Sequence, residues 1–157
     1  MTEKKSLIWD ETFPALILKG EGSSAFLHGQ TTADIFSQTK SERIFRSCWL
    51  STKGNLKALL EIRISINMAE IAIISGQLNS VINGFESVIF PADKVNLEVI
   101  KPIRRLQKIS KYNSWKESNP SWQDGNNLLL KKTYDYNKLT NEELEIWKIR
   151  QGIPSFE

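Results

Sequence analysis

Apolar and polar residues alternate between residues 43 and 66. Within 56–66 the apolar residues share one strand face and the polar residues share the other: Leu60, Ile62, Ile64 and Ile66 against Glu61, Arg63 and Ser65. A period of two is typical of a strand with one buried face. Residues 43–50 alternate in a similar way, and the turn at 51–55 contains Gly54, which can adopt a positive φ. The pattern predicts a β-hairpin.

Further apolar runs predict three more strands, at 15–19, 71–75 and 95–100. Between the last two, apolar residues recur at helical spacing over 78–90, and Pro91 would end that helix. A strand–strand–helix–strand order is typical of the start of a split β-α-β module. The sequence therefore predicts an α+β fold.

Two short helical segments are expected around the stretch FLHGQTTADIF. Ser23 or Ser24 can cap the first, which would run to about His28. The second would cover 32–36, with Thr31 or Thr32 as its cap and Asp34 in its first turn, where a negative charge favours the helix dipole.

A longer helix is predicted to begin at Thr140, because Thr140 and Glu143 have the spacing of a capping box. Its buried stripe would contain Leu144 and Trp147, with Ile146 or Ile149 as further candidates. Gly152 and Pro154 would end it.

The length and composition are those of one globular domain, or of two small intertwined ones. The 157 residues are 40% hydrophobic and 25% charged, with a net charge of +3 that permits an anionic ligand or RNA but does not require one. A single cysteine, Cys48, excludes an intrachain disulfide and a four-ligand Cys/His zinc site, so no metal is expected. The beginning of the sequence lacks a signal-peptide core, and no apolar run has membrane-spanning length, so we expect a cytoplasmic protein.

Common catalytic motifs are missing. His28 is the only histidine, and it is interpreted as a partly exposed helical residue. Gly20 and Gly22 follow a strand, but the third glycine of a dinucleotide-binding loop is absent.

A basic run covers 101–111, with cations at Lys101, Arg104, Arg105, Lys108 and Lys111 between apolar residues. These cations can form a solvated face. Alternatively, Arg104, Arg105 and Lys108 contact a polyanion, in which case Trp115 and Trp122 can stack on bases of a bound RNA. This second interpretation predicts a protein- or RNA-binding module.

Four segments resemble, in order, those of the YgfZ/GcvT-type folate-binding proteins. Gly20–Ile35, GEGSSAFLHGQTTADI, is similar to their G-x-D-x-x-x-F-L-Q-G-Q-x-T-x-D-V segment. Cys48–Asn55, CWLSTKGN, resembles their D-x-K-G-R turn, and Pro91–Leu97 resembles the segment that closes their first α+β module. Trp147–Pro154, WKIRQGIP, is similar to R-x-x-x-G-I-P.

The resemblance implies an aminomethyltransferase-like folate-binding fold with tetrahydrofolate or a derivative as ligand. It implies one folate-binding-like unit over 1–157, with a ferredoxin-like module inserted at 56–135. It also implies a supporting role in iron–sulfur cluster assembly or repair and in tRNA modification, with iron–sulfur proteins or tRNA as partners.

The implied folate contacts lie in three polar corners and are Gln30, Thr31, Asp34, Lys53, Asn55 and Arg150. Gly29, Gly54 and Gly152 would give the ligand access to the backbone. Gln30 can both donate and accept hydrogen bonds toward a pterin edge, and Lys53 can pair with a glutamate tail.

The sequence departs from the family pattern at several positions. Gly22 replaces an acid, and Asn55 replaces an arginine. Lys57 and Ala58 stand where enzymatic relatives carry a carboxylate, so we expect folate binding without aminomethyl transfer, with a transferase as the alternative. The K-G-C-Y-x-G-Q-E motif is absent. We therefore expect this chain to be the N-terminal part of a longer family member, or a truncated relative.

Overall fold

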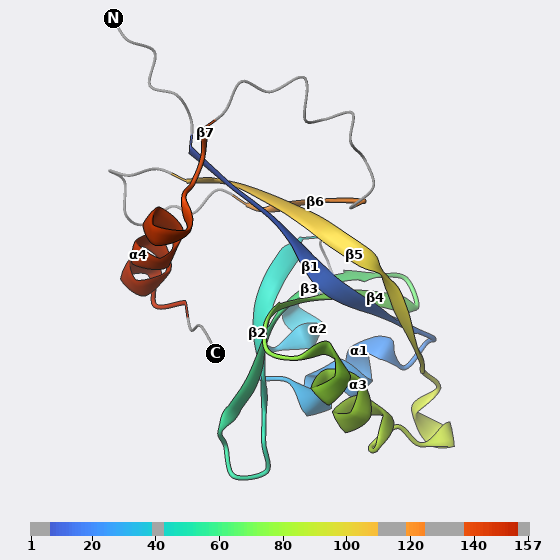
Figure 1. Cartoon of the computed structure of the whole chain (residues 1–157). Coiled ribbons are helices and arrows are strands. Elements are labelled where there is room, and N and C mark those ends of the chain that lie inside the picture. The colour runs from blue at the N-terminus through green and yellow to red at the C-terminus, as the bar shows by residue number, and fades with distance from the viewer. Residues whose placement is uncertain (1–6, 39–42, 110–118, 125–136, 154–157) are drawn as a thin grey trace, which may run out of the picture. The chain divides into compact units, whose positions relative to one another are not determined.

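The computed structural model describes residues 7–38, 43–109, 119–124 and 137–153 (Figure 1). The chain divides into two compact units. The central unit contains Pro14–Lys101, and the terminal unit contains Met1–Phe13 with Pro102–Ser155. Trp115, Lys111 and Pro154, about which the sequence made predictions, lie outside the described residues.

The central unit contains a largely antiparallel sheet. Its strands are β2 (Ile44–Leu50), β3 (Leu56–Ser65) and β4 (Met68–Ser75), next to the parts of β1 (Leu7–Lys19) and β5 (Asn96–Ile109) that belong to this unit, in the order β2-β3-β4-β1-β5. Strands β2 and β3 pair with Cys48 opposite Leu59, which confirms the predicted hairpin. The predicted strands at 15–19, 71–75 and 95–100 are also present, inside longer strands.

Helices cover one face of this sheet. Helices α1 (Ser23–Gln30), α2 (Ile35–Gln38) and α3 (Leu78–Glu86) bury apolar residues against the strands (Figure 1). The most deeply buried members of this core, each at most 2% exposed, are Leu16, Leu18, Leu27, Ile35, Ala58, Leu60, Ile62, Ala69, Ile71, Ile73, Val81 and Phe85. The apolar face predicted from the alternation in β3 is therefore the core face.

Aromatic rings join the helices to the hairpin. The ring centroids of Trp49 and Phe85 lie 5.7 Å apart, and those of Phe26 and Phe85 lie 5.6 Å apart, both with edge-to-face geometry. Helix α3 approaches Trp49 so closely that a Cβ atom at Gly84 would lie 2.2 Å from the indole ring. The glycine therefore allows α3 to pack directly on Trp49.

The other face of β3 differs from its prediction. Glu61 was expected on an exposed polar face, but it is 1% exposed. Its carboxylate lies 3.6 Å from the Nε atom of Arg46, which is directly opposite on β2. Ile66, expected at the end of the buried stripe, lies beyond β3 in the turn to β4 and is 93% exposed. The strand is covered on both faces in its middle and ends one residue early.

Several helix ends also differ from the predictions. Neither Ser23 nor Ser24 is the cap of α1: the cap residue is Gly22, and the hydroxyl of Ser23 donates to the carbonyls of Leu18 and Gly20. The predicted second turn at 32–36 forms later, as α2, so Asp34 precedes the helix instead of lying in its first turn.

Helix α3 ends at Glu86, four residues before its predicted end at Phe90. Phe90 is extended, with φ −113° and ψ 159°, and precedes the 3₁₀ turn η1 (Pro91–Asp93). The proline ring disfavours the helical conformation of the residue before it, so Pro91 prevents Phe90 from continuing the helix.

The terminal unit contains strand pairs and one helix. The β5 segment from Pro102 pairs antiparallel with β6 (Ser121–Asp124), and Leu7 and Ile8 of β1 pair in parallel with β7 (Asn137–Lys138). Helix α4 (Asn141–Gln151) begins with the predicted capping box: the Glu143 N–H donates to Thr140 Oγ1 at 3.2 Å, and the Thr140 N–H donates to Glu143 Oε2 at 3.1 Å.

Trp9 lies at the centre of the terminal unit and is 2% exposed. Two cations lie over its ring: Arg105 Cζ is 4.2 Å and Lys148 Nζ is 5.2 Å from the ring centroid. The indole of Trp147, on α4, lies 5.7 Å away. Two cations and a second indole thus connect β5 and α4 to β1 within this unit.

The fold is therefore a mixed α and β fold, as predicted at the coarse level. No helix in the described ranges is long and apolar enough to cross a membrane.

Candidate functional site

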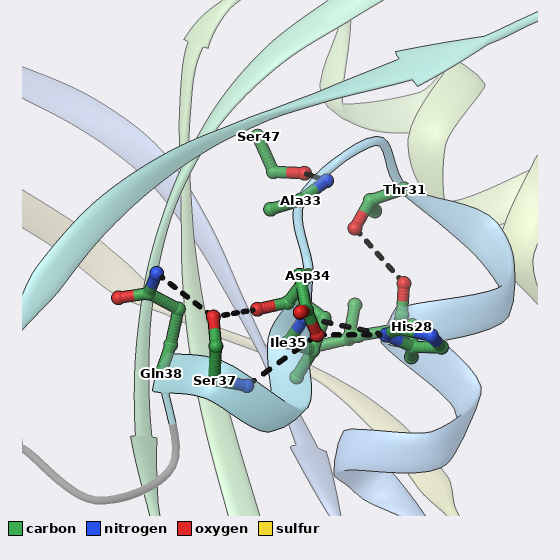
Figure 2. A network of polar contacts seen from close by, with 9 residues as sticks. His28, Thr31, Ala33, Asp34, Ile35, Ser37, Gln38 and Ser47 are labelled. Carbon is green, nitrogen blue, oxygen red and sulfur yellow. Dashed lines mark hydrogen bonds and ion pairs between the residues drawn. The ribbon is translucent and has the colours of Figure 1, made fainter.

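Three hydrogen bonds, of which Figure 2 shows the one between Ala33 and Ser47, hold the corner between α1 and β2 on β2. The Thr32 N–H donates to the Cys48 carbonyl at 3.0 Å, and the Cys48 N–H donates to Thr32 Oγ1 at 3.0 Å. The Ala33 N–H donates to Ser47 Oγ at 2.9 Å. Because these bonds use the backbone and small hydroxyls, they fix the corner and leave larger side chains for other contacts.

The His28 side chain contacts the residues at the start of α2. Its Nδ1 atom accepts a hydrogen bond from the Ile35 N–H at 3.3 Å and lies 3.7 Å from Asp34 Oδ1 (Figure 2). The imidazole also stacks on Phe36, with centroids 4.4 Å apart. His28 is thus a half-exposed helical residue, as predicted, and its ring contacts the residues that begin α2.

The three predicted contacts in this corner differ in what they can offer a ligand. Asp34 is exposed. Among the described residues, its carboxylate accepts one long bond, 3.4 Å, from the Ser37 N–H in addition to its approach to His28. Gln30 is half-buried, and its amide has no hydrogen-bond partner among the described residues. Thr31 instead donates its hydroxyl to the Leu27 carbonyl at 2.9 Å. That hydroxyl stabilises the end of α1.

The second corner is the hairpin turn. Gly54 adopts φ +81°, and its N–H donates to the Ser51 carbonyl. The Ser51 N–H donates to the Asn55 carbonyl at 2.8 Å, and the Asn55 N–H donates to Ser51 Oγ at 3.1 Å. Lys53 and the side chain of Asn55 are exposed. The turn directly follows β2, and Thr31 forms an isolated bridge with Trp49 of that strand. Both corners are therefore attached to β2.

Residues after the turn supply no carboxylate to this region. The Lys57 ammonium lies 4.7 Å from the centroid of the Trp49 ring, and Ala58 is fully buried in β3. Glu61, the nearest acid along the chain, is buried beside Arg46.

The third corner belongs to the terminal unit. Arg150 is exposed in the last turn of α4, and Gly152 adopts φ +66° at the C-terminal cap of that helix. The structure thus brings two of the three predicted corners together on one unit and describes the third separately.

The basic run is a continuation of β5, and its two arginines are buried. Arg104 is 6% exposed and binds Asp10 through two hydrogen bonds, Nε to Oδ1 at 2.8 Å and Nη2 to Oδ2 at 2.7 Å. Arg105 is 0% exposed and donates to Gln107 Oε1 at 2.7 Å. The prediction that the run displays these cations is wrong; Lys108 is exposed. A polyanion would have to displace buried partners to reach either arginine.

A hollow of about 450 Å³ on the central unit lies elsewhere, between the start of α1 and η1. It is lined by Glu21, Gly22, Ala25, Phe26, Ala92, Asp93 and Lys94. None of the predicted folate contacts lines it. Among the described residues, no three His, Cys, Asp or Glu side chains converge as metal ligands.

Neither a protein-family model nor a curated protein matches this sequence. The structure is similar to the crystal structure of glycine cleavage system aminomethyltransferase T from Bartonella henselae, with a TM-score of 0.54 and 13% sequence identity. The similarity covers 65% of this chain and 28% of that longer chain. It confirms an aminomethyltransferase-like fold, and at this identity it concerns the fold alone. The sequence comparisons add no support for YgfZ proteins in particular.

Proposed function

We propose that this chain binds a reduced folate without transferring its one-carbon group. The fold similarity makes a folate a reasonable ligand class. The single observation that most supports the proposal is the attachment of two polar corners to the same strand, β2, through the bonds of Thr32 and Ala33 and the bridge of Thr31.

The exposed groups of these corners suit different parts of a folate. The Gln30 amide can donate and accept, and the Asp34 carboxylate can accept from the N–H groups of a pterin edge. The Lys53 ammonium can pair with a carboxylate of the glutamate tail, with Asn55 as a neutral donor beside it. Gly29 and Gly54 leave the backbone accessible, since a Cβ at either position would meet no atom within 4 Å.

The absence of transfer follows from Lys57 and Ala58. An ammonium stacked on Trp49 and a buried methyl group cannot act as a carboxylate near the reactive nitrogen of the folate. A supporting role toward iron–sulfur proteins or tRNA modification is part of the proposal through the sequence resemblance only.

Titration with tetrahydrofolate tests the proposal. We expect saturable heat in calorimetry and a change in tryptophan fluorescence. Asp34→Asn and Lys53→Gln should each weaken binding about tenfold, because a charge-assisted bond is worth about 1.5–3 kcal/mol when desolvated and less at the surface. The matched controls are Glu86→Gln and Lys101→Gln, which change exposed charges outside both corners. Absence of heat with the folded wild-type chain would overturn folate binding.

A second variant locates the ligand. Ala25→Trp fills the hollow between α1 and η1 and should leave folate affinity unchanged. If Ala25→Trp abolishes binding while Asp34→Asn does not, the ligand occupies the hollow and the proposed contacts are wrong. Detectable tetrahydrofolate-dependent aminomethyl transfer would contradict the non-catalytic part.

A further inference from the structure

Helix α4 carries apolar side chains on two opposite sides. Leu144 is buried, and Trp147 and Lys148 contact Trp9, so these residues form the inner side of the helix. Successive residues are rotated by about 100° in an α-helix. Ile146 and Ile149 therefore lie on the opposite side, and they are 46% and 75% exposed. A helix of a monomeric domain normally has one apolar side, and this second, exposed apolar pair is therefore available to a partner.

Opposite charges flank the stripe symmetrically. Glu142 lies four residues before Ile146, and Arg150 lies four residues after it. Residues four apart lie above one another on a helix, so the three side chains form one row beside Ile149. Both charged residues are exposed, and neither has an ion-pair partner in the described part of the chain.

We propose that this stripe, Glu142, Ile146, Ile149 and Arg150, binds the same stripe of a second copy, with the two α4 helices antiparallel. A two-fold axis beside Ile146 places Ile146 against its equivalent. The same axis places Glu142 opposite the partner's Arg150, and Arg150 opposite the partner's Glu142. The charge order of the row is thus complementary to itself when reversed, as a two-fold interface requires. This charge pattern favours a second copy over an unrelated apolar partner.

The resulting contact is small. Four side chains per copy bury less than the roughly 1,200 Å² of a stable specific interface. The two ion pairs lie at the rim, where each contributes about 1 kcal/mol or less. Association is therefore weak, and it occurs at high protein concentration or when the copies are held together by other contacts.

The inference is independent of the proposed folate site, although the sequence resemblance also implies Arg150 as a folate contact. An Arg150 side chain that pairs with Glu142 of a second copy is unavailable to a folate carboxylate. If folate and the second copy both bind Arg150, added folate will dissociate the two copies. If only the second copy binds Arg150, added folate will leave the self-association unchanged.

Charge reversal on the full chain is the first test, measured by sedimentation equilibrium at protein concentrations up to about 1 mM, the weak end of specific affinities. Glu142→Arg and Arg150→Glu should each weaken self-association at least about tenfold, because each places like charges opposite one another. An equimolar mixture of the two variants should associate again, since each Arg then faces a Glu. Circular dichroism confirms that both variants keep α4. A monomeric wild-type chain throughout this range, or a mixture that stays monomeric, would overturn the proposal.

A cross-linking test does not depend on altered charges. In a Cys48→Ser background, Ile146→Cys should form a disulfide-linked pair of chains on mild oxidation. When two helix axes are about 8–10 Å apart, Cα atoms that face each other across the contact come within disulfide reach. The matched control is Ile66→Cys, which is more exposed at 93% and lies outside the stripe. Equal cross-linking of the two variants would contradict the antiparallel arrangement.

Discussion

Two helical glycines differ in the space around them, and this difference gives the first prediction. A Cβ at Gly84 in α3 would lie 2.2 Å from the Trp49 ring, whereas one at Gly29 in α1 would meet nothing within 4 Å. Alanine normally favours a helix over glycine. We expect Gly84→Ala to lower the free energy of unfolding by about 1–3 kcal/mol through overpacking. Gly29→Ala should leave it unchanged or raise it by less than about 1 kcal/mol.

Urea unfolding of both variants checks this prediction. Equal effects of the two substitutions would show that α3 can move away from Trp49 at little cost.

The pair formed by Asp10 and Arg104 gives the second prediction. Their side chains are 12% and 7% exposed and share two hydrogen bonds. Removing one partner of such a pair leaves a buried charge, so Asp10→Asn should lower the free energy of unfolding by about 3–5 kcal/mol. Replacing both partners, as Asp10→Leu with Arg104→Met, should recover most of that loss.

The exposed pair of Lys19 and Glu98 is the control. These side chains are 51% and 52% exposed, and Lys19→Gln should change stability by less than about 1 kcal/mol. A small effect of Asp10→Asn would instead show that the pair is well solvated.

Charged residues were the hardest to predict from the sequence. Arg104 lies 94 positions from Asp10 along the chain, and Glu61 meets Arg46 only across the hairpin. Strand periodicity assigns such residues to solvent, because it contains no information about a distant partner. Their burial depends on tertiary pairing, which local pattern cannot express.

At the scale of elements, the capping box of α4 gives the third prediction. The Thr140 hydroxyl accepts from the Glu143 N–H. Thr140→Ala should lower the free energy of unfolding by about 1 kcal/mol, because an N–H of the first helical turn loses its acceptor. Thermal unfolding measures the change. Thr52→Ala, at an exposed position of the hairpin turn, is the matched control and should have no such effect.

Local chemistry explains which elements could be predicted. The hairpin and α4 have their signals within a few residues, namely a period of two around Gly54 and the pair of Thr140 and Glu143. The end of α3 and the cap of α1 were predicted incorrectly. Ser23 points its hydroxyl back toward β1 because Gly20 and Gly22 pack against the backbone of Lys94 and Asp93, a contact that the local sequence does not reveal.

At the scale of the whole molecule, folate binding should change the NMR chemical shifts mainly of residues in the central unit. In ¹H–¹⁵N spectra we expect the largest shifts at the amides of residues 29–35 and 51–55. The indole N–H of Trp49 should also shift, because the backbone of Trp49 forms a bridge with that of Thr31. The indole signals of Trp9 and Trp147, in the terminal unit, should move least.

Shifts at α4 that are as large as those at β2 would support the third predicted corner, with Arg150 as a folate contact. Shifts confined to residues 21–26 and 92–94 would place the ligand in the hollow and contradict the proposed site.

The aminomethyltransferase-like fold was predictable from short segments in the right order, whereas the joint attachment of two corners to β2 was not. Gln30 and Lys53 are 23 positions apart in the sequence. Only the bonds of Thr32 and Ala33 to β2 show that they belong to neighbouring segments of the same unit.

The indole pair of Trp9 and Trp147 has an optical consequence. With centroids 5.7 Å apart and ring planes inclined at 63°, the two chromophores are close enough and skewed enough for their excited states to couple. Such a pair gives two circular dichroism bands of opposite sign in the far ultraviolet, and Trp147→Phe abolishes both. Light alone can therefore follow the docking of α4 on β1, without any label attached to the chain.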